Sequence, residues 1–261
     1  MMQIESIKNF FPYEVRENAS FQKYMLKEYI QLLILDFLST TPFIKKIVFI
    51  GGTNLRIVKG IDRFSEDLDF DCKDFTKEEF LAMTDAVLNF LKRAGLRVEV
   101  HDRENKKLTA FRRSFYFPEL LFELGFSGHK EERFLIKVET ENQQIPYKPV
   151  SINIKGCGLF FPFPAAPDGV LCSMKISAML SRSKGRDFYD VMFLLAQTQP
   201  NYSFLSEKLN IHNLKELKTS VLELLKTVDL EVKKSDFEHL LFNKRNGERI
   251  LSIRDFIREL K

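Results

Sequence analysis

The stretch Ile47–Asp71, IVFIGGTNLRIVKGIDRFSEDLDFD, decides how the fold of this chain is interpreted. Its pattern predicts a buried strand, a glycine turn, a short helix, a loop and a second strand. In order, these are Ile47–Ile50, Gly51-Gly52, a helix opened by Thr53, a loop, and Leu68–Asp71. We therefore expect this segment to belong to the part of the chain that contains a β-sheet.

Two carboxylates stand two residues apart in this segment, at Asp67 and Asp69. Side chains at i and i+2 of a strand point to the same face, and like charges placed so close repel unless a cation lies between them. A hard cation such as Mg²⁺ prefers oxygen ligands. A solvated turn is the alternative, but apolar Leu68 and Phe70 favour a strand. We predict that Asp67 and Asp69 are catalytic and bind Mg²⁺ or Mn²⁺.

The two glycines upstream suit an anion. Gly51 and Gly52 let the backbone approach a bulky group, and the N-terminus of the following helix offers free N–H groups to phosphate. Thr53 is either the N-cap of that helix or a phosphate ligand, and both roles can hold at once. Together with the two acids, this arrangement indicates nucleotide chemistry.

The residues just described carry a family resemblance. GGT followed by D-x-D resembles the nucleotidyltransferase signature of the DNA polymerase β-like superfamily. The longer string Gly51–Phe70, GGTNLRIVKGIDRFSEDLDF, resembles the AbiEii/AbiGii toxin family. Its members are nucleotidyltransferases of bacterial abortive-infection and toxin–antitoxin systems, and they are related to MenT toxins. The resemblance implies transfer of a nucleotide from an NTP to an acceptor hydroxyl, with release of pyrophosphate. It also implies a cognate antitoxin and a tRNA acceptor, with a protein side chain as second choice.

The same resemblance indicates further site residues. Members of the superfamily commonly take a third metal-binding carboxylate from a neighbouring strand, and the candidate here is Glu139 in FLIKVETE. The family usually has Asp at this position. Lys137 shares a strand face with Glu139 and is a candidate nucleotide-binding residue, although an exposed Lys/Glu face of an edge strand is an alternative. Arg63 is expected either to bind phosphate or to pair with a nearby acid.

A second group of charged residues lies in Leu171–Leu195, LCSMKISAMLSRSKGRDFYDVMFLL. Lys175 and Arg182 are two helical turns apart and share a face, as do Asp187 and Asp190 at i and i+3. The string resembles a later motif of the family, A-x-K-x-x-A followed by R-D-x-x-D. This implies that Lys175 is catalytic and neutralises nucleotide phosphate, and that Asp187 and Asp190 orient it or take part in catalysis. A surface salt-bridge network is the alternative. Arg182 belongs to a basic patch with Lys184 and Arg186, and this patch suits either the triphosphate of the nucleotide or an acidic acceptor.

The remaining pattern predicts an α+β fold: a polymerase β-like core of mixed sheet and flanking helices, then a C-terminal helical domain. We place the core at 1–165 and the helical domain, which is expected to complete the active site, at 166–261. Other expected strands are Arg97–His101, Phe111–Phe117 and Phe134–Thr140. Expected helices are Ala19–Leu38, Thr76–Ala94, Asp168–Leu180, Asp187–Gln197, Leu214–Val228, Ser235–Phe242 and Ile250–Leu260. Three prolines argue against regular structure throughout Leu159–Pro167.

Composition sets broader limits. The chain has 261 residues, 44% of them hydrophobic, with a formal net charge of +4 that permits a nucleic-acid partner. Its three cysteines are widely spaced, so we expect a reducing cytoplasm. The apolar run Ile30–Leu38 is interrupted by Gln31 and Asp36 and is too short to span a bilayer, so we expect no membrane association. Two alternatives to a toxin remain open: a small-molecule nucleotidyltransferase of the aminoglycoside-modifying type, and a nucleotide-binding module without turnover.

Overall fold

The fold is that of a computed structural model, which describes residues 4–101 and 110–261. The chain divides into two compact units, a sheet unit and a helical unit. The sheet unit comprises 1–60, 64–144 and 149–165, and the helical unit comprises 61–63, 145–148 and 166–261. The short segment Ile61–Arg63 thus belongs to the helical unit, although both of its flanking residues belong to the sheet unit.

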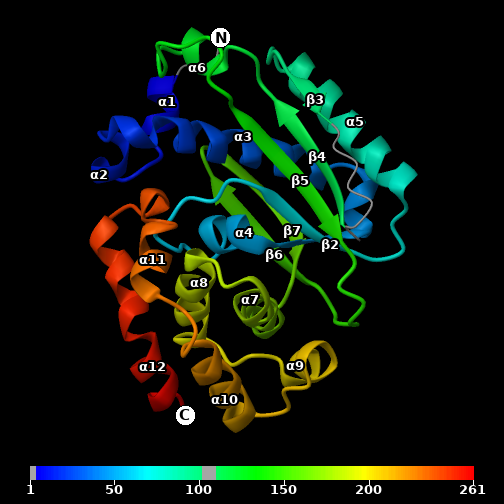
Figure 1. Ribbon diagram of the computed structural model, residues 1–261. Coiled ribbons are helices and arrows are strands. Elements are labelled where there is room, and N and C mark those ends of the chain that lie inside the picture. Colours follow the sequence, from blue (N-terminus) through cyan, green and yellow to red (C-terminus); the bar gives the residue numbers. More distant parts are fainter. Residues whose placement is uncertain (1–3, 102–109) are drawn as a thin grey trace. The chain divides into compact units, whose positions relative to one another are not determined.

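A mixed seven-stranded sheet forms the centre of the sheet unit (Figure 1). Its strand order is β3-β4-β5-β2-β1-β7-β6. The strands are β1 (Ile47–Ile50), β2 (Leu68–Cys72), β3 (Glu99–His101), β4 (Phe111–Tyr116), β5 (Leu135–Glu141), β6 (Val150–Gly156) and β7 (Leu159–Ala165). The short strand β2 lies in the middle of this order and carries the predicted acidic motif.

The register around β2 fixes which residues are neighbours. β2 runs antiparallel to β1, which places Ile50 opposite Asp69. On its other side β2 runs parallel to β5, which places Asp69 opposite Glu139. β4 then continues the same row antiparallel to β5, with Arg112 opposite Glu139. One row across three strands therefore contains two acids and an arginine.

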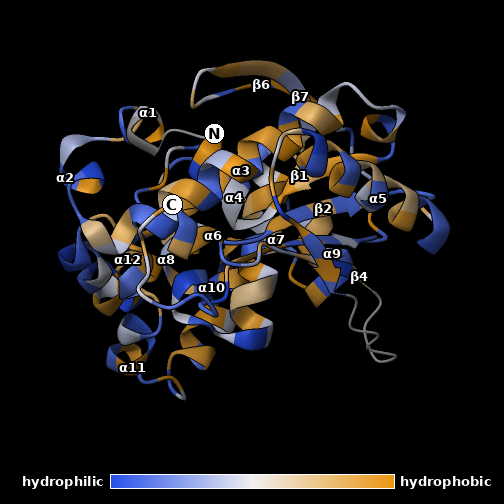
Figure 2. Cartoon of the chain, turned by 90° about the horizontal axis from the view of Figure 1, so that it is seen from above, coloured by the Kyte–Doolittle hydropathy of each residue, from blue (hydrophilic) through white to orange (hydrophobic). Residues whose placement is uncertain are grey.

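The helices of the sheet unit are α1 (Ile4–Lys8), α2 (Tyr13–Arg16), α3 (Gln22–Ser39), α4 (Gly51–Ile57), α5 (Lys77–Arg93) and α6 (Leu120–Glu123). Three of them, α3, α4 and α5, pack against strands of this sheet. The longest, α3, is largely apolar (Figure 2) and packs against β7 and α5. α5 begins with a capping box formed by Thr76 and Glu79.

The proline-containing segment differs from expectation. Leu159–Ala165 forms the regular strand β7, so the prediction of broken structure there is wrong. β7 pairs with β6 along its whole length but with β1 only at Ala165. Pro162 and Pro164 are two residues apart, so both missing N–H donors fall on the same side of the strand. One edge of β7 therefore needs few hydrogen-bond donors. The partner strand β6 was not predicted from the sequence.

The helical unit consists of helices joined by short turns (Figure 1). They are α7 (Asp168–Arg182), α8 (Gly185–Leu195), α9 (Tyr202–Leu209), α10 (Leu214–Leu224), α11 (Leu230–Ser235) and α12 (Ile253–Glu259), with 3-10 helices at Glu238–Leu240 and Lys244–Ser252. α9 and α11 were not predicted, and the expected helix Ser235–Phe242 is only a 3-10 turn. The predicted α+β class, with a mixed sheet and a C-terminal helical region, is confirmed.

None of the helices described is both long and apolar enough to cross a bilayer. α3 has the length of 18 residues but carries charged side chains such as Lys27 and Glu28 within its sequence.

Candidate active site

The predicted acids lie at the start of β2 and on its neighbour β5. Asp67 directly precedes β2, Asp69 lies within it, and both side chains are partly exposed. Glu139 is the register neighbour of Asp69 on β5. Nζ of Lys137 lies 3.5 Å from Oδ2 of Asp67. The sheet therefore places the three predicted metal ligands and the predicted nucleotide-binding lysine on or beside the adjacent strands β2 and β5.

Electrostatics disfavour the charged form of Asp67. Burial raises the pKa of its carboxyl group, Lys137 lowers it, and the neighbouring carboxylates Glu139 and Glu66 raise it further. The net direction is upward, which is the behaviour of an acid whose existing cationic neighbours do not fully compensate its charge. An additional positive charge beside Asp67 would favour its ionised form.

Helix α4 packs directly against these acids. It begins at Gly51 with Ile50 as N-cap, so the prediction that Thr53 opens the helix is wrong. Of the two roles considered for Thr53, that of N-cap is excluded. Thr53 is fully buried, and its hydroxyl donates a hydrogen bond to the carbonyl oxygen of Asp67. Gly51 has φ +83° and leaves no room for a Cβ beside the carboxylate of Asp69. The GGT sequence thus fixes the backbone next to both acids.

Glu139 is held by an arginine that the sequence did not single out as a site residue. The guanidinium of Arg112 makes a two-pronged contact with Glu139: Nη2 donates to Oε2 at 2.8 Å, and Nε lies 2.6 Å from Oε1. Arg112 is half-exposed at 40% of its side chain, and Glu139 is 21% exposed. This contact could not be predicted without the strand register, because Arg112 and Glu139 are 27 residues apart.

A second unpredicted contact comes from α3. Nζ of Lys27 lies 3.1 Å from a carboxylate oxygen of Glu66, the residue before Asp67. Lys27 is buried, and its neighbour on the next turn, Gln31, donates to the carbonyl oxygen of Ser65. These two bonds tie the loop that leads into β2 to the longest helix of the unit. The sequence feature that could have indicated this contact is a lysine within a mostly apolar helix, because such a lysine is buried only when it is paired.

The donor chemistry at β2 fits a hard divalent cation. Asp67 and Asp69 offer carboxylate oxygens on one face, which is the ligand type that Mg²⁺ and Mn²⁺ prefer. In the described conformation Glu139 is engaged with Arg112, and no group of three or more acid, His or Cys side chains in 4–101 and 110–261 is close enough to share an ion. Asp67 and Asp69 are therefore the best-placed ligands, and Glu139 as third ligand stays a prediction.

The second predicted group lies in the helical unit and forms a buried ion network. Nε and Nη2 of Arg63 each donate to Asp190 at 2.7 Å, and Nζ of Lys175 lies 2.8 Å from Oδ2 of the same carboxylate. Arg63 and Asp190 are fully buried, and Lys175 is nearly so. Although burial raises the pKa of Asp190, Arg63 and Lys175 lower it to about 2. Asp190 is therefore ionised and orients both cations.

Asp187 and Arg182 form a separate pair. Two nitrogens of Arg182 donate to the two oxygens of Asp187 at 2.9 and 2.7 Å. The backbone N–H of Lys184 also donates to Asp187, which closes the turn between α7 and α8. Asp187 is buried, whereas 46% of the Arg182 side chain is exposed. The nucleotide-binding role of Arg182 and Arg63 and the catalytic role of Asp187 stay predictions.

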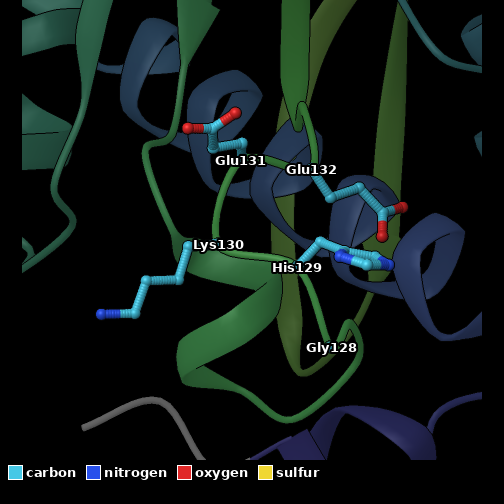
Figure 3. Close-up of a pocket in the computed structure, with 5 residues that line it drawn as sticks. All are labelled: Gly128, His129, Lys130, Glu131 and Glu132. Atoms are coloured by element: carbon cyan, nitrogen blue, oxygen red, sulfur yellow. The ribbon is translucent and has the colours of Figure 1, made fainter.

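One surface hollow lies elsewhere in the sheet unit. It is lined by the loop Gly128–Glu132 between α6 and β5, and all of these residues are exposed. Figure 3 shows that the side chains of Lys130, Glu131 and Glu132 point in different directions. Such a lining does not concentrate polar groups on one ligand, and we do not assign it a function.

Comparison with known proteins gives the class and then the family. The fold resembles solved structures that include MenT4, a nucleotidyltransferase toxin from Mycobacterium tuberculosis H37Rv. That match has a TM-score of 0.61 at 16% identity and covers 100% of this chain and 91% of that one. JHP933 from Helicobacter pylori matches with a TM-score of 0.57 at 20% identity, covering 91% of each chain. The chain therefore shares its fold with these structures, one of which is a nucleotidyltransferase toxin.

The sequence profile of the family described as "Nucleotidyl transferase AbiEii toxin, Type IV TA system" matches residues 33–242. The chain belongs to this family of toxin–antitoxin nucleotidyltransferases, as its GGT and D-x-D motifs predicted. A search of curated proteins gives no match.

Proposed function

We propose that this nucleotidyltransferase uses Mg²⁺ or Mn²⁺ on Asp67 and Asp69 to transfer a nucleotide from an NTP to a hydroxyl group of tRNA. The observation that carries the proposal is the contact between α4 and β2, where GGT lies directly against both acids. A bound dication would offset charge on the attacking and leaving oxygens at the α-phosphate. Asp67 and Asp69 would hold it, and Lys137 would remain available beside Asp67 for a phosphate oxygen.

The helical unit supplies the other proposed roles. By resemblance to the family motif, Lys175 would offset triphosphate charge, and Asp190 would orient it through the contact already described. That this unit completes the active site stays part of the proposal. Gly51, Gly52 and Thr53 are proposed to seat the phosphates by their backbone, since the Thr53 hydroxyl donates to Asp67.

The distribution of charge supports a polyanionic acceptor. The helical unit contains 18 Lys and Arg against 14 Asp and Glu, whereas the sheet unit contains 22 of each. The whole formal excess of +4 therefore belongs to the helical unit. RNA backbones are bound by such an excess of basic side chains. Arg182, Lys184 and Arg186, around the turn between α7 and α8, are the basic residues that we propose for acceptor contacts.

Cellular context completes the proposal. The toxin–antitoxin family implies a cognate antitoxin that counteracts this chain. Its three cysteines are all free thiols, which suits the reducing cytoplasm in which tRNA is present.

The decisive experiment incubates the purified protein with each α-labelled NTP in turn, Mg²⁺ and total RNA from bacteria. Label is expected in the tRNA fraction with one NTP preferred, and Asp69→Asn, treated identically, should leave the RNA unlabelled. Transfer of label to protein or to a small molecule, with none in tRNA, would replace the acceptor. Equal labelling by the Asp69→Asn protein would refute the assignment of the site.

A further inference from the structure

We propose that Arg112 sets the affinity of the acids on β2 and β5 for a divalent cation by competing with that cation for Glu139. The inference rests on the proposed role of Asp67 and Asp69 as metal ligands and adds a residue that controls their affinity. Arg112 is a positioning residue in this view, because it acts through Glu139.

Arg112 and two acids form a single row across the sheet. Asp69, Glu139 and Arg112 occupy matched register positions on β2, β5 and β4. Both oxygens of Glu139 contact the guanidinium, at 2.8 and 2.6 Å. A two-pronged contact of this kind orients the carboxylate as well as neutralising it. The pairing therefore determines where the third acid points.

The charges at this end of the sheet affect how a dication could bind there. Three carboxylates occupy neighbouring positions, those of Asp67, Asp69 and Glu139. Lys137 contacts Asp67, and Arg112 contacts Glu139. A dication that used Glu139 together with the β2 acids would lie close to the guanidinium charge and be repelled by it. Arg112 must therefore release Glu139, or the cation must bind with two carboxylates instead of three.

The guanidinium of Arg112, once released from Glu139, would be able to bind phosphate. An arginine freed from Glu139 at the edge of this site has five N–H donors and a charge that matches a phosphate oxygen. Because Arg112 is half-exposed, its change of partner requires no opening of the core. The exchange would make the free protein bind the cation weakly and would link tighter cation binding to the arrival of triphosphate.

The test measures Mn²⁺ binding directly, by the loss of the electron paramagnetic resonance signal of free Mn²⁺ on titration into the full-length protein. Arg112→Gln should bind Mn²⁺ roughly two- to fivefold more tightly than the wild type, the range expected for release of a half-exposed ion pair. Arg97→Gln is the matched control, because it removes an arginine from the exposed ion pair with Glu119 in the same unit. Its affinity for Mn²⁺ should equal that of the wild type.

A second background separates competition from simple loss of charge. In Glu139→Gln the further change Arg112→Gln should bring no gain, because the carboxylate under competition is absent. Adding inorganic triphosphate, with a correction for the Mn²⁺ that it binds in the absence of protein, should tighten Mn²⁺ binding more in the wild type than in Arg112→Gln. Unchanged or weaker Mn²⁺ binding by Arg112→Gln, or a gain that survives in the Glu139→Gln background, would overturn the proposal.

The underlying function is tested separately in the same titration. Asp69→Asn should bind Mn²⁺ much more weakly than the wild type, whether or not Arg112 is present. If Asp69→Asn binds Mn²⁺ like the wild type, the metal assignment of the proposed function fails. If Asp69 matters and Arg112 does not, only the present inference fails.

Discussion

Gly51 and Asp69 lie so close together that a Cβ on Gly51 would overlap the carboxylate of Asp69. The two residues are brought together because Ile50, at the end of β1, is the register partner of Asp69 on β2. Gly51 also has φ +83°, a backbone angle that residues other than glycine rarely adopt. The first glycine of the motif is thus required both by its backbone conformation and by the space that the predicted metal ligand occupies.

This relationship predicts different outcomes at two glycines of similar backbone conformation. Gly51→Ala should abolish nucleotidyl transfer and destabilise the protein, because the new methyl group displaces Asp69. Gly60→Ala has φ +73° but meets nothing within 4 Å, so only backbone strain of about 1–2 kcal/mol is expected. Transfer of labelled NTP and urea denaturation measure the two effects. Activity in Gly51→Ala equal to that in Gly60→Ala would show that the close approach to Asp69 has no functional consequence.

The network around Asp190 predicts a large loss of stability on removal of its charge. Asp190→Asn should lower the free energy of unfolding at pH 7 by about 3–5 kcal/mol, because Arg63 and Lys175 are left buried without their acid. Asp255→Asn is the control in the same unit: its carboxylate is 74% exposed and pairs with Arg258, and its loss should cost at most about 1 kcal/mol. Equal stability of the two variants would contradict this view of the network.

The same carboxylate predicts a pH dependence. The pKa of Asp190 is lowered from 3.8 to about 2 in the folded protein, so its stabilisation is complete above pH 3.8. As the pH falls from 3.8 toward 2, the unfolded chain takes up the proton first and this contribution is lost. The stability difference between wild type and Asp190→Asn should therefore shrink across this interval. Urea midpoints of both proteins at matched pH measure it, and a constant difference down to pH 2 would refute the assignment.

How far the sequence predicted this protein depends on how local each feature is. The acids on β2 could be recognised because an i, i+2 spacing on a strand fixes a shared face without any knowledge of the partners. The expected helix Thr76–Ala94 matches α5, whose start is marked by the capping box of Thr76 and Glu79. By contrast, the contact between Arg63 and Asp190 joins residues 127 positions apart, and only the tertiary fold shows that Arg63 meets an acid in this conformation.

The errors have similar causes. β7 was missed because prolines usually exclude a strand. In the structure, β7 pairs with β1 only at Ala165, so this edge of β7 needs few N–H donors. The short helices α9 and α11 have too few turns for a clear apolar period, and their first turns are fixed by the side chains of Asn201 and Asp229. Arg112 was not identified as a site residue because strand register cannot be counted from spacing alone.

Lys175 provides a test of the family motif in the helical unit. Lys175→Ala should weaken the use of NTP by roughly 1–3 kcal/mol, the scale of a lost charge-assisted contact. Saturation curves for NTP measure it as a higher KM, a lower kcat or both. Lys208→Ala on α9 removes an exposed lysine of the same unit and should behave like the wild type. Unchanged kinetics in a folded Lys175→Ala protein would limit Lys175 to the ion network with Asp190.

Expression in bacteria without an antitoxin tests the toxin activity of the chain and its dependence on the β2 acids. Wild-type protein should arrest growth, and the double variant Asp67→Asn/Asp69→Asn should not, because two charged oxygen ligands become neutral amides of similar shape. Immunoblots at matched expression levels and thermal melting of the purified variant exclude loss of the protein as the cause. tRNA isolated from arrested cells should carry added nucleotides that are absent with the double variant. Arrest that persists in the double variant would separate toxicity from nucleotidyl transfer, whereas arrest that depends on both acids with unmodified tRNA would assign toxicity to another acceptor.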